Sequence, residues 1–148
     1  MTYDLDRISR RLTLAEGKRN LMYPDSKGIP TVGVGHNMRN PISDAAVAQI
    51  LADDIAVHVA ELDEHLPWWR QLDPVRQEVM IELMFNMGWG AGLRGLSTFK
   101  NTLEAIRTGR WEMAASGLQN SKWARDVKSR AGVVCSALET GVWPAGAF

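Results

Sequence analysis

Residues 16–36, EGKRNLMYPDSKGIPTVGVGH, constrain the fold of this chain more than any other stretch. Its middle is a run of proline, aspartate, serine and glycine, which are turn-forming residues and exclude a continuous helix. The segment PTVGVGH then alternates valine with threonine or glycine, the two-residue period of a β-strand. We therefore predict a β-hairpin or small sheet over residues 20–36. Gly33 and Gly35 are predicted to share one strand face with Thr31, where glycines leave room for a close approach.

The same stretch carries two carboxylates and a hydroxyl. Glu16 is predicted to lie in the last turn of a helix that begins at Asp4 and stops at Gly17. Asp25 lies in the turn, and Thr31 opens the strand. Paired carboxylates are what hydrolysis of a glycosidic bond requires. Each residue also has an ordinary role, as a solvated charge, a turn residue or a β-former, so the spacing alone does not decide.

Helical patterns dominate the rest of the chain. Apolar residues recur at three- and four-residue steps between residues 43 and 65, which predicts a helix roughly 33 Å long at 1.5 Å per residue. Another helix is predicted from the N-cap Asp73 to Gly88. Further helices are predicted over residues 97–109, over residues 110–119, and from Asp126 to Gly141.

These elements predict an α+β fold in one domain, residues 1–148. A small N-terminal sheet lobe spans about residues 17–42, and a long helix, about 43–66, joins it to a mainly helical lobe, about 67–148. The helix at residues 4–16 is expected to pack on the helical lobe.

Charge and composition exclude several classes of function. Lys+Arg and Asp+Glu both number 17, so the chain lacks the basic excess typical of nucleic-acid binding. Cys135 is the only cysteine, and neither it nor the histidines have the spacing of a zinc site. We expect no metal and no cofactor. The charged N-terminus predicts neither a signal peptide nor a membrane span, so we expect synthesis in the cytoplasm and no stable membrane insertion.

An ordered series of motifs along the chain resembles the phage-type lysozymes, the endolysins of tailed phages. A glutamate–glycine pair ends a helix, Tyr-x-Asp follows, and then Gly-x-x-Thr-x-Gly-x-Gly-His. The helical part adds further matching segments. These are residues 84–88 (MFNMG), 109–111 (GRW), 121–123 (SKW), 130–131 (RA) and 140–143 (TGVW).

The resemblance implies a lysozyme-like fold and a division of roles among three residues. Glu16 would be the general acid that protonates the leaving glycosidic oxygen. Asp25 would stabilise positive charge on the sugar ring and help to position the attacking water. Thr31 would hold that water.

The resemblance also implies supporting residues in the helical lobe. Arg130 corresponds to the arginine that pairs with the catalytic glutamate. Asn86 falls at a position that helps to hold sugar, and its neighbours Phe85 and Met87 are further candidate contacts, although both also suit the core. His36 is expected to have a structural role, forming a salt bridge with an aspartate of the long helix. That aspartate would be Asp53 or Asp54.

The implied function is hydrolysis of the β-1,4 bond between N-acetylmuramic acid and N-acetylglucosamine in peptidoglycan. The expected protein is a monomeric endolysin of a phage or prophage. It would be made in the host cytoplasm and would reach the wall, in the periplasm, after holin-mediated release. Two alternatives are a lytic transglycosylase, which cleaves the same bond without adding water, and a non-catalytic wall-binding module.

Overall fold

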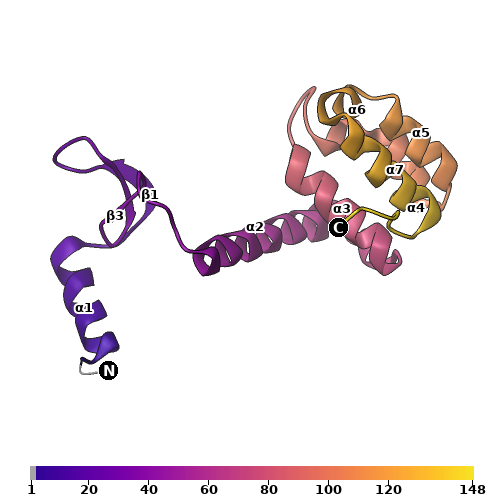
Figure 1. Cartoon of the computed structure of the whole chain (residues 1–148). Helices are drawn as coiled ribbons and strands as arrows, with labels where there is room; N and C mark the ends of the chain where they lie inside the picture. The colour runs from indigo at the N-terminus through magenta and orange to yellow at the C-terminus, as the bar shows by residue number, and fades with distance from the viewer. Residues whose placement is uncertain (1–2) are drawn as a thin grey trace. The chain divides into compact units, whose positions relative to one another are not determined.

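The computed structural model describes residues 3–148, and Figure 1 shows a small sheet followed by a long helix and a group of shorter helices. The chain divides into two compact units, residues 1–50 and 51–148, and the boundary falls inside the long helix α2. The predicted α+β fold is confirmed. Residues 1 and 2, the start of the predicted domain, lie outside the described residues.

The elements follow one another in the order that the sequence predicts, with additional short segments. In chain order they are α1 (Leu5–Glu16), β1 (Arg19–Pro24), β2 (Pro30–Gly33), β3 (His36–Asn37), α2 (Asp44–His65), the 3₁₀ helix η1 (Pro67–Gln71), α3 (Pro74–Met87), the 3₁₀ helix η2 (Leu96–Thr98), α4 (Lys100–Arg107), α5 (Trp111–Gln119), α6 (Lys122–Val127) and α7 (Ser129–Thr140).

Local capping explains why α1 has the predicted bounds. The Asp4 carboxylate accepts a hydrogen bond from the backbone N–H of Arg7 at 2.9 Å, which satisfies a free donor of the first turn. At the other end, the N–H of Gly17 donates to the carbonyl of Thr13 at 2.9 Å. The helix therefore ends at Glu16, as predicted.

The sheet is antiparallel with strand order β1-β2-β3. Tyr23 pairs with Thr31, and Val32 pairs with His36. The prediction of one continuous strand over residues 30–36 was wrong, because the chain turns between these two paired residues. Alternation of valine and glycine fits a strand, but it also fits a short connection, here the two residues 34–35, between two strands.

The hydrophobic core lies in the unit formed by residues 51–148. There α5 packs against α4 and α7, and α3 packs against α7. Met80 and Met84, both on α3, are fully buried in this core. The largest fully buried side chains are Trp69, Leu62, Met80, Leu83, Met84, Leu96, Ile106, Leu118, Leu138, Val79 and Val134.

Cys135 is also buried in this core, where it packs as a small hydrophobic residue. Burial raises the pKa of its thiol to about 11, and the nearby Glu139 adds to the effect. In residues 3–148, no helix combines the length and apolar character that crossing a membrane requires.

The last predicted helix covers the end of α6 and all of α7, so its predicted start at Asp126 was wrong. Helix α6 begins earlier, capped by Ser121, whose hydroxyl accepts from the N–H of Ala124 at 3.2 Å. The break follows at Lys128, where φ is 55° and ψ is −122°. Lysine gives no local indication of this backbone conformation, which residues other than glycine rarely adopt. The end of α7 before Gly141 is as predicted.

Replacing Lys128 with glycine is expected to raise the free energy of unfolding by about 1 kcal/mol, because it removes backbone strain worth about 1–3 kcal/mol against the smaller entropy cost of glycine. Chemical denaturation measures the change. Lys128→Ala is the matched control, since it removes the charge and keeps the β-carbon, and it should stay near wild type. Equal stabilities of the glycine and alanine variants would contradict the assignment of strain.

The junction between α2 and η1 is fixed by Asp63. Its carboxylate accepts from Arg70 Nε at 2.7 Å and Nη2 at 2.8 Å, and from Trp69 Nε1 at 2.8 Å. The hydrogen bond from Arg70, supported by the one from Trp69, lowers the pKa of Asp63 to about 2. Because the folded-state pKa is below that of the unfolded chain, the stabilising contribution is present above about pH 4 and is lost as the pH falls toward 2.

Wild type is therefore expected to lose more stability between about pH 5 and pH 2 than the variant Asp63→Asn, which has no carboxylate to protonate. Urea unfolding at a series of pH values measures the gap between the free energies of unfolding of the two proteins. The gap should be largest near neutral pH and should close in acid. A gap that stays constant over this range would contradict the role of the Asp63 carboxylate.

Candidate active site

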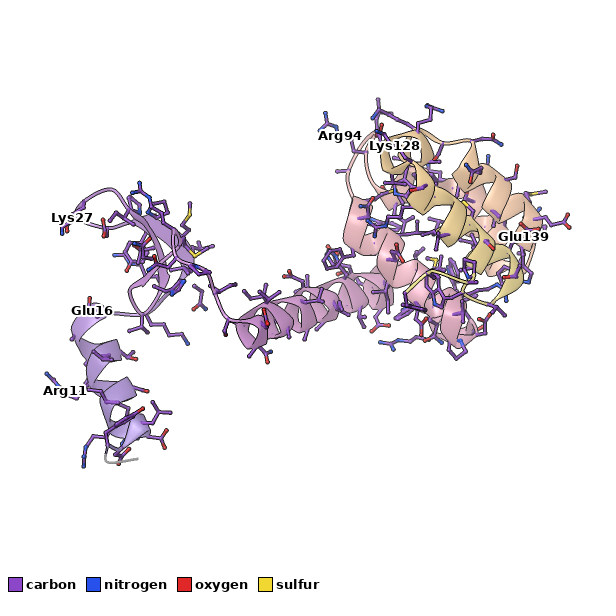
Figure 2. All side chains as sticks on the ribbon, viewed as in Figure 1. Arg11, Glu16, Lys27, Arg94, Lys128 and Glu139 are labelled. Carbon is purple, nitrogen blue, oxygen red and sulfur yellow. The ribbon has the colours of Figure 1, made fainter. Side chains whose placement is uncertain are left out.

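Glu16 is exposed at the end of α1 (Figure 2). Its side chain lies near the connection between β2 and β3. The pairing of Arg19 with Gly33 brings the start of β1 beside this connection, and the short link 17–18 brings the end of α1 with it. A β-carbon placed on Gly35 would be 3.9 Å from both Cγ and Oε2 of Glu16. The sheet thus supports the carboxyl on one side while solvent reaches it on the other.

Asp25 follows β1 directly, and its side chain organises the turn to β2. Its Oδ1 accepts from the N–H of Lys27 at 2.7 Å and of Ile29 at 2.9 Å. This local bonding is typical of aspartate in turns. Both bonds fall on one oxygen, and among residues 3–148 no side chain or N–H donates to Oδ2. The second oxygen of a half-buried carboxylate is therefore available to a ligand.

Thr31 is 4% exposed, and it is the buried residue of the sheet. Its hydroxyl donates to the carbonyl of Ile29 at 2.9 Å. Because the hydroxyl proton is engaged, the lone pairs of Oγ1 remain and Thr31 presents an acceptor to a ligand or a water molecule.

The peptide groups of Ile29 connect these two residues. The Ile29 N–H donates to the Asp25 carboxylate, and its carbonyl accepts from both the Asp25 N–H and the Thr31 hydroxyl. Asp25 and Thr31 are thus held in one hydrogen-bonded turn. Backbone groups have no signature in the sequence, so the role of Ile29 could not be predicted.

The approach of Glu16 to Gly35 is the kind of close contact that the glycines of this segment indicate. Glycines on the strand were expected to leave room for a close neighbour, and Gly35 has one. Gly33 has none within 4 Å of its β-carbon position.

Asn86 lies on α3 in the helical unit. Its Oδ1 accepts from the indole N–H of the buried Trp123 at 2.8 Å. An indole only donates, so the bond fixes the orientation of the amide and leaves its NH₂ group for a further acceptor. The neighbouring Phe85 is 41% exposed, while Met87 packs against the core. Contacts of these residues with sugar stay predictions.

Arg130, on α7, donates from Nε to Glu82 Oε1 at 2.7 Å, with both side chains partly exposed. Both belong to the unit of residues 51–148, whereas Glu16 belongs to the other unit. The pairing of Arg130 with Glu16 stays a prediction.

His36 begins β3, and its Nε2 atom is buried without a hydrogen-bond partner among residues 3–148. Asp53 lies on α2 beyond the boundary between the units. Their salt bridge stays a prediction. Across the part of the chain that the structure describes, no three His, Cys, Asp or Glu side chains cluster as metal ligands.

Comparison with known proteins identifies the family. The family model for phage lysozyme matches residues 13–140. Probable T4-type lysozyme 1 of Dictyostelium discoideum is 25% identical over 90% of this chain and 94% of its own length, and Probable T4-type lysozyme 2 of the same organism is 25% identical over 85% and 89%. Pre-baseplate central spike protein Gp5 of Enterobacteria phage T4 is 28% identical over 90% of this chain, which spans 28% of that protein. Since the family match covers both the sheet and the helical unit, the chain belongs to the phage lysozyme family and is a lysozyme-type glycosidase.

Proposed function

We propose that this lysozyme hydrolyses the β-1,4 bond between N-acetylmuramic acid and N-acetylglucosamine in peptidoglycan. The observation that carries the proposal is the turn in which Asp25 and Thr31 are bonded through the same residue, Ile29. Glu16 belongs to the same unit, so the unit of residues 1–50 supplies an acid, a second carboxylate and a hydroxyl.

Each group has a defined task in this reaction. Glu16, protonated, donates to the leaving glycosidic oxygen as the bond breaks. Asp25, ionised, opposes the positive charge that develops on the sugar ring in an oxocarbenium-like transition state. Its free Oδ2 is the atom that meets the sugar or the attacking water.

Thr31 orients the attacking water. Because its hydroxyl donates to Ile29, it accepts a hydrogen bond from the water and leaves a water lone pair for the sugar carbon. This polarity suits a nucleophilic water. The Thr31→Val variant keeps the shape of the side chain and removes the acceptor.

The proposal is tested by incubating purified protein with peptidoglycan and measuring both clearing and the appearance of reducing ends. Hydrolysis creates one new reducing end for each bond that is cut. A non-catalytic wall-binding module would bind the wall without clearing it. A lytic transglycosylase would clear it and leave anhydro ends, which do not reduce. Either of the last two results would refute hydrolysis.

We further propose that the protein is a monomeric endolysin that acts on the wall of its host after release through a holin. The support is its membership of the phage lysozyme family. Expression in a bacterium tests this role. Lysis is expected when a membrane-permeabilising protein is co-expressed and not in its absence. Equally rapid lysis under both conditions would rule out holin dependence.

A further inference from the structure

The connection between β2 and β3 approaches Glu16 at a single glycine. The nearest atoms to a β-carbon built on Gly35 are Cγ and Oε2 of Glu16, each at 3.9 Å, which is van der Waals distance. Apart from Gly35 itself and its chain neighbours Val34 and His36, no other part of the described chain lies within 4 Å of that position. The backbone of Gly35 thus lies close to the Glu16 side chain.

We propose that Gly35 is a positioning residue for the general acid. Its bare backbone leaves the volume beside the Glu16 carboxyl open, and this volume admits the leaving-group oxygen and the water that solvates the acid. The inference rests on the proposed role of Glu16 in catalysis.

A methyl group at Gly35 would lie in contact with Oε2 and occupy part of this volume. Two consequences follow for the reaction. At this ordinary contact distance the carboxyl itself need not move, but the methyl would hold the glycosidic oxygen away from it, and small misplacements of a reacting group cost up to about 100-fold in rate. The methyl would also exclude water from the carboxylate, which disfavours its charged form.

The chain offers a matched control two residues earlier. Gly33 has φ +67° and Gly35 has φ +74°, so alanine is strained to a similar degree at both positions. A β-carbon on Gly33 would meet nothing within 4 Å. The pair of alanine variants therefore separates contact with Glu16 from backbone strain.

The experiment compares wild type, Gly35→Ala and Gly33→Ala on peptidoglycan over a range of pH. Gly35→Ala is expected to lower kcat by about 10- to 100-fold with KM within about twofold. The high-pH limb of its kcat/KM profile, where the acid loses its proton, should move to higher pH. Gly33→Ala should keep kcat within about threefold of wild type and leave the profile in place, because its β-carbon would not contact Glu16.

Equal losses of kcat in the two alanine variants would overturn the proposal, as would a loss confined to KM or an unshifted profile in Gly35→Ala. Circular dichroism verifies that each variant is folded. If Gly35→Ala does not fold, Gly35→Asn replaces it, because asparagine tolerates positive φ and still places a side chain beside Glu16.

Glu16→Gln distinguishes failure of this inference from failure of the proposed function. If Glu16→Gln retains wild-type activity, the proposed function fails, whatever Gly35→Ala does. If Glu16→Gln is inactive and the two alanine variants behave alike, the role of Gly35 alone fails. The proposal expects the double variant Gly35→Ala, Glu16→Gln to be no slower than Glu16→Gln.

Discussion

Replacing Glu16 with glutamine is expected to lower the rate of peptidoglycan hydrolysis by about 10²–10⁴-fold, because an amide cannot deliver the proton that the leaving oxygen requires. The fold should be unaffected. Glu16 is exposed, and among residues 3–148 it has no side-chain hydrogen bond that a glutamine would break, while α1 is held at its ends by Asp4 and Gly17. Turbidity clearing at equal protein concentration measures the loss, and thermal unfolding verifies that both proteins are folded.

Glu112→Gln is the matched control for this variant. Glu112 is an exposed glutamate in the first turn of α5, so its replacement removes the same charge from another helix end. Clearing by Glu112→Gln should stay close to wild type. Wild-type clearing by Glu16→Gln would contradict the assignment of the acid.

Replacing Arg76 with methionine is expected to lower the free energy of unfolding of the helical unit by about 2–4 kcal/mol. Arg76 donates from Nε to the carbonyl of Leu138 and from Nη2 to that of Glu139, both at 2.7 Å, which satisfies the last turn of α7. A third donor, Nη1, meets Asp73 at 2.8 Å, and the guanidinium lies 3.9 Å from the centre of the Trp111 ring.

This arginine is only 12% exposed, so a methionine would leave the carbonyls and Asp73 without their partner in a poorly hydrated place. Burial raises the pKa of Asp73, but the hydrogen bonds from Arg76 outweigh it and leave that pKa below its usual value. Arg76→Lys keeps the charge and loses the fork of donors, so an intermediate loss is expected. Urea unfolding measures all three proteins.

Arg107→Met provides the control for Arg76→Met. Arg107 makes two hydrogen bonds to Glu104, at 2.7 and 2.8 Å, but its side chain is 50% exposed. Exposed pairs of this kind contribute about 0–1 kcal/mol. Equal destabilisation by the two methionine variants would contradict the role of Arg76 in satisfying the last turn of α7.

Local signals in the sequence predicted those elements whose ends are fixed by nearby residues. Asp4 and Asp73 cap α1 and α3 with their own carboxylates, and Gly17 and Gly88 end the same helices. Capping depends on residues three or four positions apart, so it can be read before the fold is known.

Features that depend on distant partners could not be predicted in the same way. The break at Lys128 has no glycine or proline to mark it, so the helix predicted from Asp126 runs across it and misses most of α6. The contact of Arg76 with α7 joins residues more than 60 positions apart. The turn at Gly35 depends on the pairing of His36 with Val32, which no local residue pattern indicates.

The candidate site residues also differ in whether they lie close together in the sequence or come from distant segments. Glu16, Asp25 and Thr31 lie within one short stretch, where spacing and turn chemistry have a direct structural meaning, and the bonds through Ile29 give two of them a shared geometry. Arg130 and Asn86 come from the helical unit, where the structure gives them the partners Glu82 and Trp123. Their roles toward sugar depend on the resemblance and stay predictions.

The direction of a water molecule onto the sugar by Asp25 and Thr31 is tested most directly by digesting peptidoglycan in ¹⁸O-labelled water and weighing the released muropeptides. One ¹⁸O atom at the new reducing end of each product is the predicted result. Unlabelled anhydro products would contradict it, because the sugar would then have closed on its own hydroxyl without water.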